Sequence, residues 1–167
     1  MTTVTAEAIR TDRLLLLPVR VEHAEEMAEA LADPALHTFI GGAPDTAQAL
    51  RSRYRRWAAG SPDPAVSWCN WVIQLRAEAC LVGTVQATIG DGAAELAWVV
   101  GTSWQGRGIA TEAARGLVDW LAPQPVRRLL AHIHPDHWAS AAVAAAVGLT
   151  PTDRWQDGER GWERVIC

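Results

Sequence analysis

Cysteine is scarce in this sequence of 167 residues, and its distribution excludes a disulfide framework. Cys69, Cys80 and Cys167 are three in number, and none of them belongs to a C-x-x-C pair. An odd, scattered set is typical of a protein that stays in a reducing compartment. We therefore expect a cytoplasmic protein that is long enough to bury a core without help from disulfides or metals.

Strong charge of one sign and long apolar runs are also absent. The formal net charge is −4 and no basic tract stands out, which argues against nonspecific nucleic-acid binding. The opening MTTVTAEAIRTDRLLLLPV has only four consecutive leucines before a proline, too few for a signal peptide or a membrane span. We expect a single domain over residues 1–167, without a membrane segment, as a monomer or a homodimer.

The first third of the sequence predicts one strand and two helices. Arg13–Val19 has the apolar character of a strand, and EHAEEMAEALAD (22–33) predicts a short helix after it. A second helix is expected to begin near Asp45 and Thr46, whose side chains can cap it. The apolar residues of this helix fall on one face: Leu50, Tyr54 and Trp57.

The rest of the sequence begins with β structure. We predict strands over 68–75, 81–89 and 93–100, and GDG at 90–92 predicts a hairpin turn. The remaining expected elements are the helix after Gly108, a strand over 126–134, a helix from near Asp136 or His137 to Gly148, and closing strands in the tail. This order favours a mixed α/β (α+β) fold over a doubly wound sheet.

The stretch SWQGRGIATEAARGLVDWL (103–121) places two glycines and an arginine between a strand and a helix. Unpaired N–H groups at the start of a helix attract an anion, although glycine also serves plain connections by giving the backbone freedom. A dinucleotide-binding fingerprint fails here, because Thr111 stands where the third glycine belongs. Besides a plain connection and a dinucleotide-binding loop, the third alternative is a loop that binds the pyrophosphate of coenzyme A.

Four motifs in the expected order resemble one family. QGRGIA (105–110) fits the Q/R-x-x-G-x-G/A signature of the GNAT superfamily of acetyl-coenzyme-A-dependent N-acetyltransferases. AELAWVV precedes this signature, TEAARGLVDWLA follows it, and HPDHWASAAVAAAVGL lies beyond. The opening IRTDRLLLLPVRVEHAEEM and LVGTV resemble the branch of ribosomal-protein alanine N-acetyltransferases. The resemblance spans nearly the whole chain and implies a mostly antiparallel central sheet flanked by helices, with a splayed strand pair that holds the coenzyme.

The resemblance also implies acetyl-CoA as the co-substrate. Amides of the loop and the helix dipole behind them would bind its pyrophosphate, and Arg107 could add charge at the rim. The pantetheine arm is expected to pair with exposed backbone of the preceding strand. The expected coenzyme-binding residues are Trp98, Val99, Val100, Gln105, Gly106, Arg107, Gly108, Ile109, Ala110 and Thr111.

Acetyl transfer to a primary amine, by direct attack through a tetrahedral intermediate, needs a base for the amine. Glu95, on the strand that leads to the loop, is the first candidate, and a glutamate on a solvated strand face is its plain alternative. His137 is the second candidate, although it could simply cap the last helix. Glu159 and Glu163 are weaker options near the C-terminus.

The proton donor for the leaving thiolate departs from the family pattern N-x-x-A-x-x-x-Y. The single tyrosine, Tyr54, lies in the second predicted helix, and His137 replaces the asparagine. Ser140 matches the N-x-x-S variant of the ribosomal-protein branch, where serine is the proposed acid, although serine near a helix start often bonds only to backbone. These departures leave open a catalytically inactive module that binds or senses acyl-CoA.

Histidines and tryptophans are the remaining candidates for a site. His132, His134 and His137 have a spacing that could hold zinc, but H-P-D also matches the family's ordinary strand–helix junction, so we expect no metal. Core positions are expected for Trp71, Trp98 and Trp120. In this family the acceptor groove is surrounded by the segments that carry Trp57, Trp138, Trp155 and Trp162, and we expect Trp57, Trp138 and Trp162 to bind substrate. Scattered carboxylates favour a small-molecule or peptide amine over a polyamine.

Overall fold

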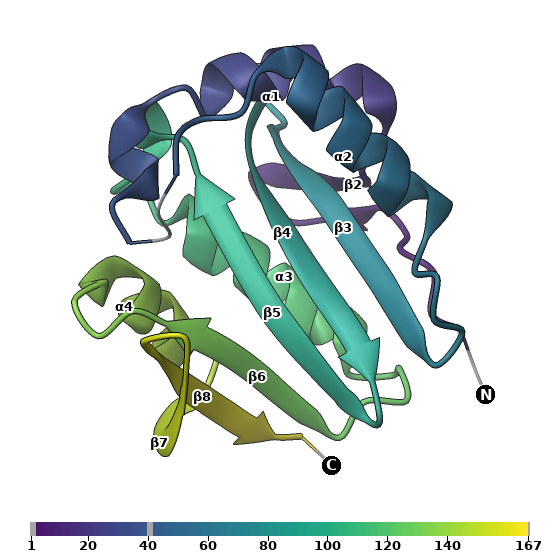
Figure 1. The fold of residues 1–167 in the computed structure, drawn as a ribbon, viewed down its shortest axis with the longest axis vertical. Coiled ribbons are helices and arrows are strands. Elements are labelled where there is room, and N and C mark those ends of the chain that lie inside the picture. Colours follow the sequence, from purple (N-terminus) through teal and green to yellow (C-terminus); the bar gives the residue numbers. More distant parts are fainter. Residues whose placement is uncertain (1–2, 40–41, 167) are drawn as a thin grey trace.

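The computed structural model describes residues 3–39 and 42–166, and these form an eight-stranded sheet with helices on both faces (Figure 1). The strands lie in the order β1-β2-β3-β4-β5-β6-β8-β7, and neighbours are antiparallel except for the parallel pair β5 and β6. Their bounds are β1 Ile9–Arg10, β2 Leu14–Pro18, β3 Val66–Leu75, β4 Cys80–Gly90, β5 Ala93–Val100, β6 Arg128–Ile133, β7 Thr150–Gln156 and β8 Glu159–Val165. The mixed, mostly antiparallel sheet predicted from the sequence is confirmed.

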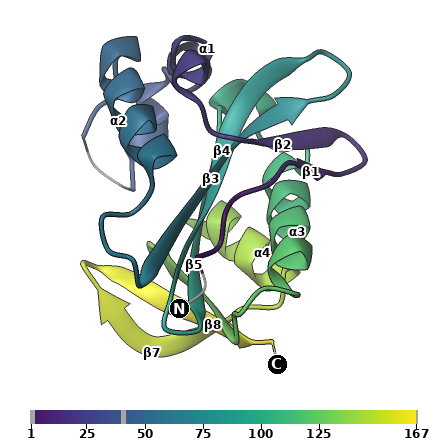
Figure 2. The same ribbon diagram turned by 90° about the vertical axis from the view of Figure 1, so that its right-hand side faces the viewer.

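The helices divide between the two faces of the sheet. Figure 2 shows α1 (Ala24–Ala30) and α2 (Ala47–Ala59) on one side, and α3 (Ile109–Leu121) and α4 (Trp138–Ala146) on the other. Short 3-10 helices connect these elements: η1 Val21–His23, η2 Pro34–His37 and η3 Thr102–Trp104. Across residues 3–39 and 42–166, no helix combines the length and the apolar character that crossing a membrane requires.

Local signals set the ends of several elements as predicted. The Thr46 side chain accepts a hydrogen bond from the Ala49 amide at 3.1 Å and so caps α2. Asp91 and Gly92 adopt φ values of 56° and 76° in the turn between β4 and β5, as a tight hairpin requires. Gly148, with φ of 89°, follows the end of α4. Strand β1 was not predicted, because two residues show no alternation.

The core consists of two clusters, one on each face of the sheet. Trp71 and Val72 are adjacent on β3 and both are fully buried, Trp71 on the α3 face and Val72 beneath α1 and α2. Trp71 meets Trp120 edge to face with ring centroids 5.1 Å apart, and Trp98 packs half-buried against the same cluster. The three tryptophans predicted for the core therefore pack as expected.

Strands β5 and β6 separate soon after they pair. Their register pairs Ala93 with Arg128, Ala94 with Leu129 and Glu95 with Leu130, whereas β5 continues to Val100 alongside β4. Figure 1 shows the two strands diverging toward α4. This is the splayed pair implied by the resemblance, and it positions the candidate site.

Candidate active site

The glycine loop, defined here as residues 105–111, joins η3 to α3 and includes the first three residues of that helix. Gly106 and Gly108 have φ values of 78° and 75°, which glycine adopts without strain. The Glu112 amide donates to the Gly108 carbonyl at 3.0 Å as the helix begins. The amides of Ile109 and the two residues after it therefore have no acceptor within the helix. Together with the helix dipole they form a site suited to an anion.

Side chains from elsewhere hold the glycine loop in place. Gln105 Nε2 donates to the Val100 carbonyl at 2.9 Å. Arg13, between β1 and β2, donates through Nη1 to the Arg107 carbonyl at 2.8 Å and through Nε to Glu112 Oε1 at 2.7 Å. Sequence reasoning assigned no role to Arg13 or Glu112, although Arg13 lies in the TDRLLLL stretch that carried part of the resemblance.

The Glu112 carboxylate is the centre of this support. Its Oε2 accepts from the Arg13 amide at 2.9 Å and also from the Thr11 hydroxyl. Burial alone would raise the pKa of Glu112, but the hydrogen bonds from Thr11 and Arg13 outweigh it and lower the pKa. A charged carboxylate therefore fixes the first turn of α3 to the β1–β2 connection.

The edge of β5 that faces β6 has no strand partner beyond Glu95 in the part of the chain that the structure describes. This edge includes Trp98, Val99 and Val100, the residues expected to face the pantetheine arm. An unpaired edge offers N–H and C=O groups to any extended ligand that carries amides.

The splay cavity, of about 250 Å³, opens between the diverging strands. Leu96, Ala97 and Trp98 line its β5 side, and Ala131 and Ile133 line its β6 side. The cavity brings together the three residues expected to act in catalysis, which came from separate parts of the sequence. Its polar and ionisable lining consists of Glu95, His132, His134, His137, Ser140 and Glu159.

Glu95 and His132 form a pair across the splay. Glu95 Oε1 lies 2.7 Å from His132 Nδ1, a short hydrogen bond between β5 and β6. The Glu95 side chain is 50% exposed, whereas that of His132 is 23% exposed. Sequence reasoning considered His132 only as a metal ligand, since the register that sets it beside Glu95 is not visible in the sequence.

His137 and Ser140 form a second pair at the start of α4. Ser140 Oγ lies 3.3 Å from His137 Nε2, and Phe39 stacks on the imidazole with ring centroids 4.6 Å apart. Burial lowers the pKa of His137, and the nearby His134 lowers it further. His137 is the N-cap residue of α4, but its side chain makes no capping bond. A neutral imidazole can therefore exchange a proton with the serine hydroxyl.

The three histidines of the H-x-H-x-x-H spacing have separate partners. His132 contacts Glu95, His134 Nδ1 accepts from the Asp136 amide at 3.1 Å, and His137 contacts Ser140. Within residues 3–39 and 42–166, no group of three or more His, Cys, Asp or Glu side chains could hold a metal ion.

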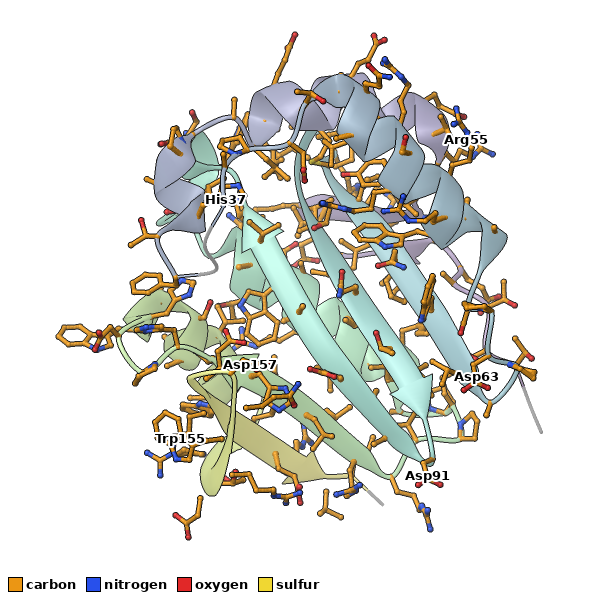
Figure 3. All side chains as sticks on the ribbon, viewed as in Figure 1. His37, Arg55, Asp63, Asp91, Trp155 and Asp157 are labelled. Carbon is orange, nitrogen blue, oxygen red and sulfur yellow. The ribbon has the colours of Figure 1, made fainter. Side chains whose placement is uncertain are left out.

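A second cavity, the helix cavity of about 270 Å³, lies between α1, η2 and α2 and the β4–β5 surface. Trp57 and Tyr54 line it from α2, and Val99 lines it from β5. Burial raises the pKa of Tyr54 to about 12, so its hydroxyl stays protonated. His37, at the end of η2, also lines this cavity and lies beside the end of β5 (Figure 3). The remaining lining residues are Ala28, Leu31, Leu36, Asp45, Leu50, Arg53, Thr84 and Gln86.

The structure does not bring the three expected substrate-binding tryptophans together. Trp57 lines the helix cavity, whereas Trp138 on α4 is 80% exposed to solvent. Trp162 pairs in register with Ala131 and packs against the core on the α3 face. Trp155, on β7, points away from the sheet (Figure 3). Trp57 is therefore the tryptophan that a ligand in the helix cavity would contact.

A comparison with known protein families identifies the family of this chain. Residues 13–150 match the model of the acetyltransferase (GNAT) domain. The chain belongs to the GNAT acetyltransferase family. Comparison with curated protein sequences finds no match.

Solved structures share the fold at low sequence identity. A GNAT-family acetyltransferase from Bacillus anthracis aligns with a TM-score of 0.78 and 19% identity, covering 96% of this chain and 99% of that one. The ribosomal L7/L12 α-N-protein acetyltransferase RimL, in complex with coenzyme A, aligns with a TM-score of 0.78 and 18% identity over 96% and 98% of the two chains. The microcin C7 self-immunity acetyltransferase MccE, in complex with acetyl-CoA and AMP, gives 0.76 and 18% over 93% and 94%.

Proposed function

We propose that residues 1–167 form one acetyl-CoA-dependent N-acetyltransferase domain that moves an acetyl group to a primary amine. The observation that carries this proposal is that the glycine loop, the unpaired β5 edge and the splay cavity adjoin one another. A phosphate site, a strand for an amide-bearing arm and a set of proton-transfer groups follow one another along β5. The family membership supports the same assignment.

Acetyl-CoA fits the residues that this chain offers. Within the described part of the chain, a Cβ atom built on Gly106 would meet no atom within 4 Å apart from its chain neighbours, so there is room beside the loop for a phosphate. The amides of Ile109, Ala110 and Thr111 would hold the pyrophosphate, and the β5 edge from Trp98 to Val100 would pair with pantetheine. Bound there, acetyl-CoA supplies the acyl carbon that the amine attacks directly. The similarity to RimL and MccE, whose structures hold CoA and acetyl-CoA, supports this assignment.

The splay cavity supplies the proton-transfer groups. A free amine is required for attack, and an ordinary alkylammonium with a pKa of ~10.4 is almost fully protonated near neutral pH. The pair of Glu95 and His132 removes that proton. Ser140, in contact with His137, donates a proton to the leaving thiolate in place of the tyrosine that many relatives use.

The helix cavity supplies the acceptor site. Its apolar walls include Leu36, Leu50 and Trp57, while its carboxylate, Asp45, is already paired with Arg53 at 2.6 Å. A polyamine needs several free carboxylates, which this cavity does not offer. We infer an acceptor that carries an apolar group beside its amine: a small molecule, or a peptide N-terminus as in the similar RimL.

The experiment is a scan of amines for acceptor-dependent release of coenzyme A. Release should be followed by chromatography, since free Cys80 would react with thiol reagents. The sequence contains no lysine, so no side-chain amine of the protein adds a background. We expect N-terminal alanyl or seryl peptides or aromatic amines to react faster than spermidine. Faster turnover of spermidine would contradict the acceptor assignment.

A matched pair of tryptophan variants tests where the acceptor binds. Trp57→Ala should raise the KM of an apolar amine about tenfold by removing part of the cavity wall, whereas exposed Trp138→Ala should leave it unchanged.

The missing tyrosine favours one other function, a catalytically inactive acyl-CoA-binding or sensing module. Tight coenzyme binding without release by any amine would establish that alternative.

A further inference from the structure

We infer that His132 is the group that takes the proton from the acceptor amine, and that Glu95 is a positioning residue that acts through it. This inference rests on the proposed N-acetyltransferase function and divides the roles within the Glu95–His132 pair. It follows from the atoms that meet, from their exposure and from the acidity of the two side-chain types.

The contact between the two residues selects the ring nitrogen that remains available. Glu95 Oε1 lies 2.7 Å from His132 Nδ1, so a proton on Nδ1 is donated to the carboxylate. The lone pair of the neutral ring is then on Nε2. A carboxylate that holds Nδ1–H in this way fixes the tautomer and stabilises the imidazolium that forms when Nε2 takes a proton.

The difference in acidity favours the imidazole as the proton acceptor. An ordinary carboxylic acid has a pKa of ~4.3 and an ordinary imidazolium ~6.5, against ~10.4 for an alkylammonium. Transfer to the carboxylate is therefore more unfavourable, and an acceptor whose pKa lies near the operating pH is the more effective base. His132 is also the less exposed member of the pair.

The other ionisable groups of the splay cavity are less suited to this role. His134, directly after β6, already accepts a hydrogen bond from the Asp136 amide through Nδ1. His137, before α4, contacts Ser140 and stacks on Phe39. Glu159, on β8, also faces the cavity. Among the residues that the structure describes, His132 is the cavity histidine that is hydrogen-bonded to a carboxylate.

The step balances without any further reactant. The ammonium first gives one proton to Nε2 of His132. The free amine nitrogen then forms a bond to the acetyl carbon and gives a tetrahedral intermediate. The intermediate loses a second nitrogen proton to solvent, its carbon–sulfur bond breaks, and the thiolate leaves with the electron pair of that bond and takes a proton from Ser140. Between turnovers His132 releases its proton to solvent and Ser140 regains one from solvent. The products are the acetamide, the free thiol and the one proton that the ammonium gives up.

The kinetic test compares four variants of the full chain at saturating acetyl-CoA. We expect His132→Gln to lower kcat/KM for the best amine by ~10²- to 10³-fold. Glu95→Gln should cost less, on the order of tenfold, because the imidazole remains. His134→Gln and Glu159→Gln are the matched changes at the other histidine and carboxylate. Coenzyme affinity, measured by calorimetry, should stay within threefold of wild type in all four, which also confirms that each one folds.

The pH–rate profile separates a base from a residue that only supports the fold. The acidic limb of the wild-type kcat/KM profile should be lost in His132→Gln and retained in Glu95→Gln. The opposite pattern, in which Glu95→Gln removes the limb and His132→Gln retains it, overturns the assignment. The assignment is also overturned if Glu159→Gln or His134→Gln lowers kcat/KM as much as His132→Gln does. A wild-type protein that binds acetyl-CoA but acetylates no amine overturns the proposed function itself.

A measurement without turnover tests the same pairing. In the ¹⁵N–¹H spectrum of the wild-type imidazoles, neutral His132 should carry its proton on Nδ1, and Glu95→Gln should reduce the population of that tautomer. A wild-type His132 with its proton on Nε2 would leave no lone pair for the amine and would overturn the assignment.

Discussion

The glycine loop and the splay cavity lie along the same strand, but backbone groups form the loop site and side chains form the cavity. The loop consists of consecutive residues, and its donors are backbone amides oriented by two positive φ angles. The cavity consists of side chains from β5, β6, the β6–α4 connection, α4 and β8, together with Phe39 after η2. The loop therefore depends on backbone conformation, while the cavity depends on which side chains the sheet register brings together.

This difference suits the two tasks that we assign to them. A pyrophosphate is the same in every reaction of acetyl-CoA, so backbone groups that need no particular side chain can hold it. The proton-transfer groups must fit one acceptor, and side chains can change from one relative to another without disturbing the sheet. Substitutions in the loop should therefore act on coenzyme affinity, and substitutions in the cavity should act on the acceptor step.

The largest effect on coenzyme affinity should come from straining the backbone of the loop. We expect Gly108→Val to weaken acetyl-CoA binding at least tenfold, because a β-branched residue resists φ of 75° at the start of α3. Among the described residues beyond its own helix and chain neighbours, a Cβ atom there would meet Arg13 Nη2, at 3.5 Å, so the cost comes from conformation rather than from a clash. Calorimetric titration with acetyl-CoA measures this loss of affinity.

Gly158→Val is the matched control for this change. Gly158 has a similar φ of 80° and open space around it, but it lies in the β7–β8 turn, far along the chain from the loop. The Gly158→Val change should strain the backbone by a similar amount and leave coenzyme affinity unchanged. Equal losses of affinity in the two variants would mean that general destabilisation, rather than the phosphate site, explains the result.

The sequence predicted the loop well because its signals are local. The glycines, the start of α3 and the preceding strand are contiguous, and the Thr46 cap and the GDG turn also act over three or four residues. Strand β1 was missed because its two residues show no period. It owes its existence to pairing with β2 and not to its own sequence pattern.

The cavity was predicted only in part, because its contacts are distant in sequence. His137 and Ser140 were proposed from the family pattern and Glu95 from its place on the strand before the loop, but the partner of Glu95 was not predicted. That pairing spans 37 residues and depends on the register that sets Glu95 beside Leu130. The face of the sheet to which Trp162 points depends in the same way on the register of β8 with β6.

A smaller effect should follow from removing the side chain that supports the loop. Arg13→Gln deletes the contacts with the Arg107 carbonyl and with Glu112, so we expect acetyl-CoA affinity to fall about threefold to tenfold. The expected loss is below that of Gly108→Val because the amides themselves remain. Arg10→Gln removes the same charge from the exposed surface of β1 and should bind the coenzyme as wild type does. Equal behaviour of the two arginine variants would show that net charge alone explains the change.

The smallest effect concerns the cavity and is a change of stability with pH. Because burial and the nearby His134 lower the pKa of His137, the folded protein binds that proton less readily than the unfolded chain does. The His137 contribution to stability is therefore complete above the unfolded pKa of ~6.5 and is lost as pH falls below it toward the folded value.

His137→Asn removes this dependence together with the contact to Phe39. At pH 7.5 the wild type should melt at a higher temperature than the variant, and at pH 5.5 the gap should narrow by on the order of 1 °C. Burial also lowers the pKa of His23, but His23 is present in both proteins and cancels in the difference. Thermal melts of the two proteins at both pH values measure the gap. A difference in melting temperature that widens in acid would mean that the protonated imidazole stabilises the fold. The assignment of a neutral His137 beside Ser140 would then be wrong.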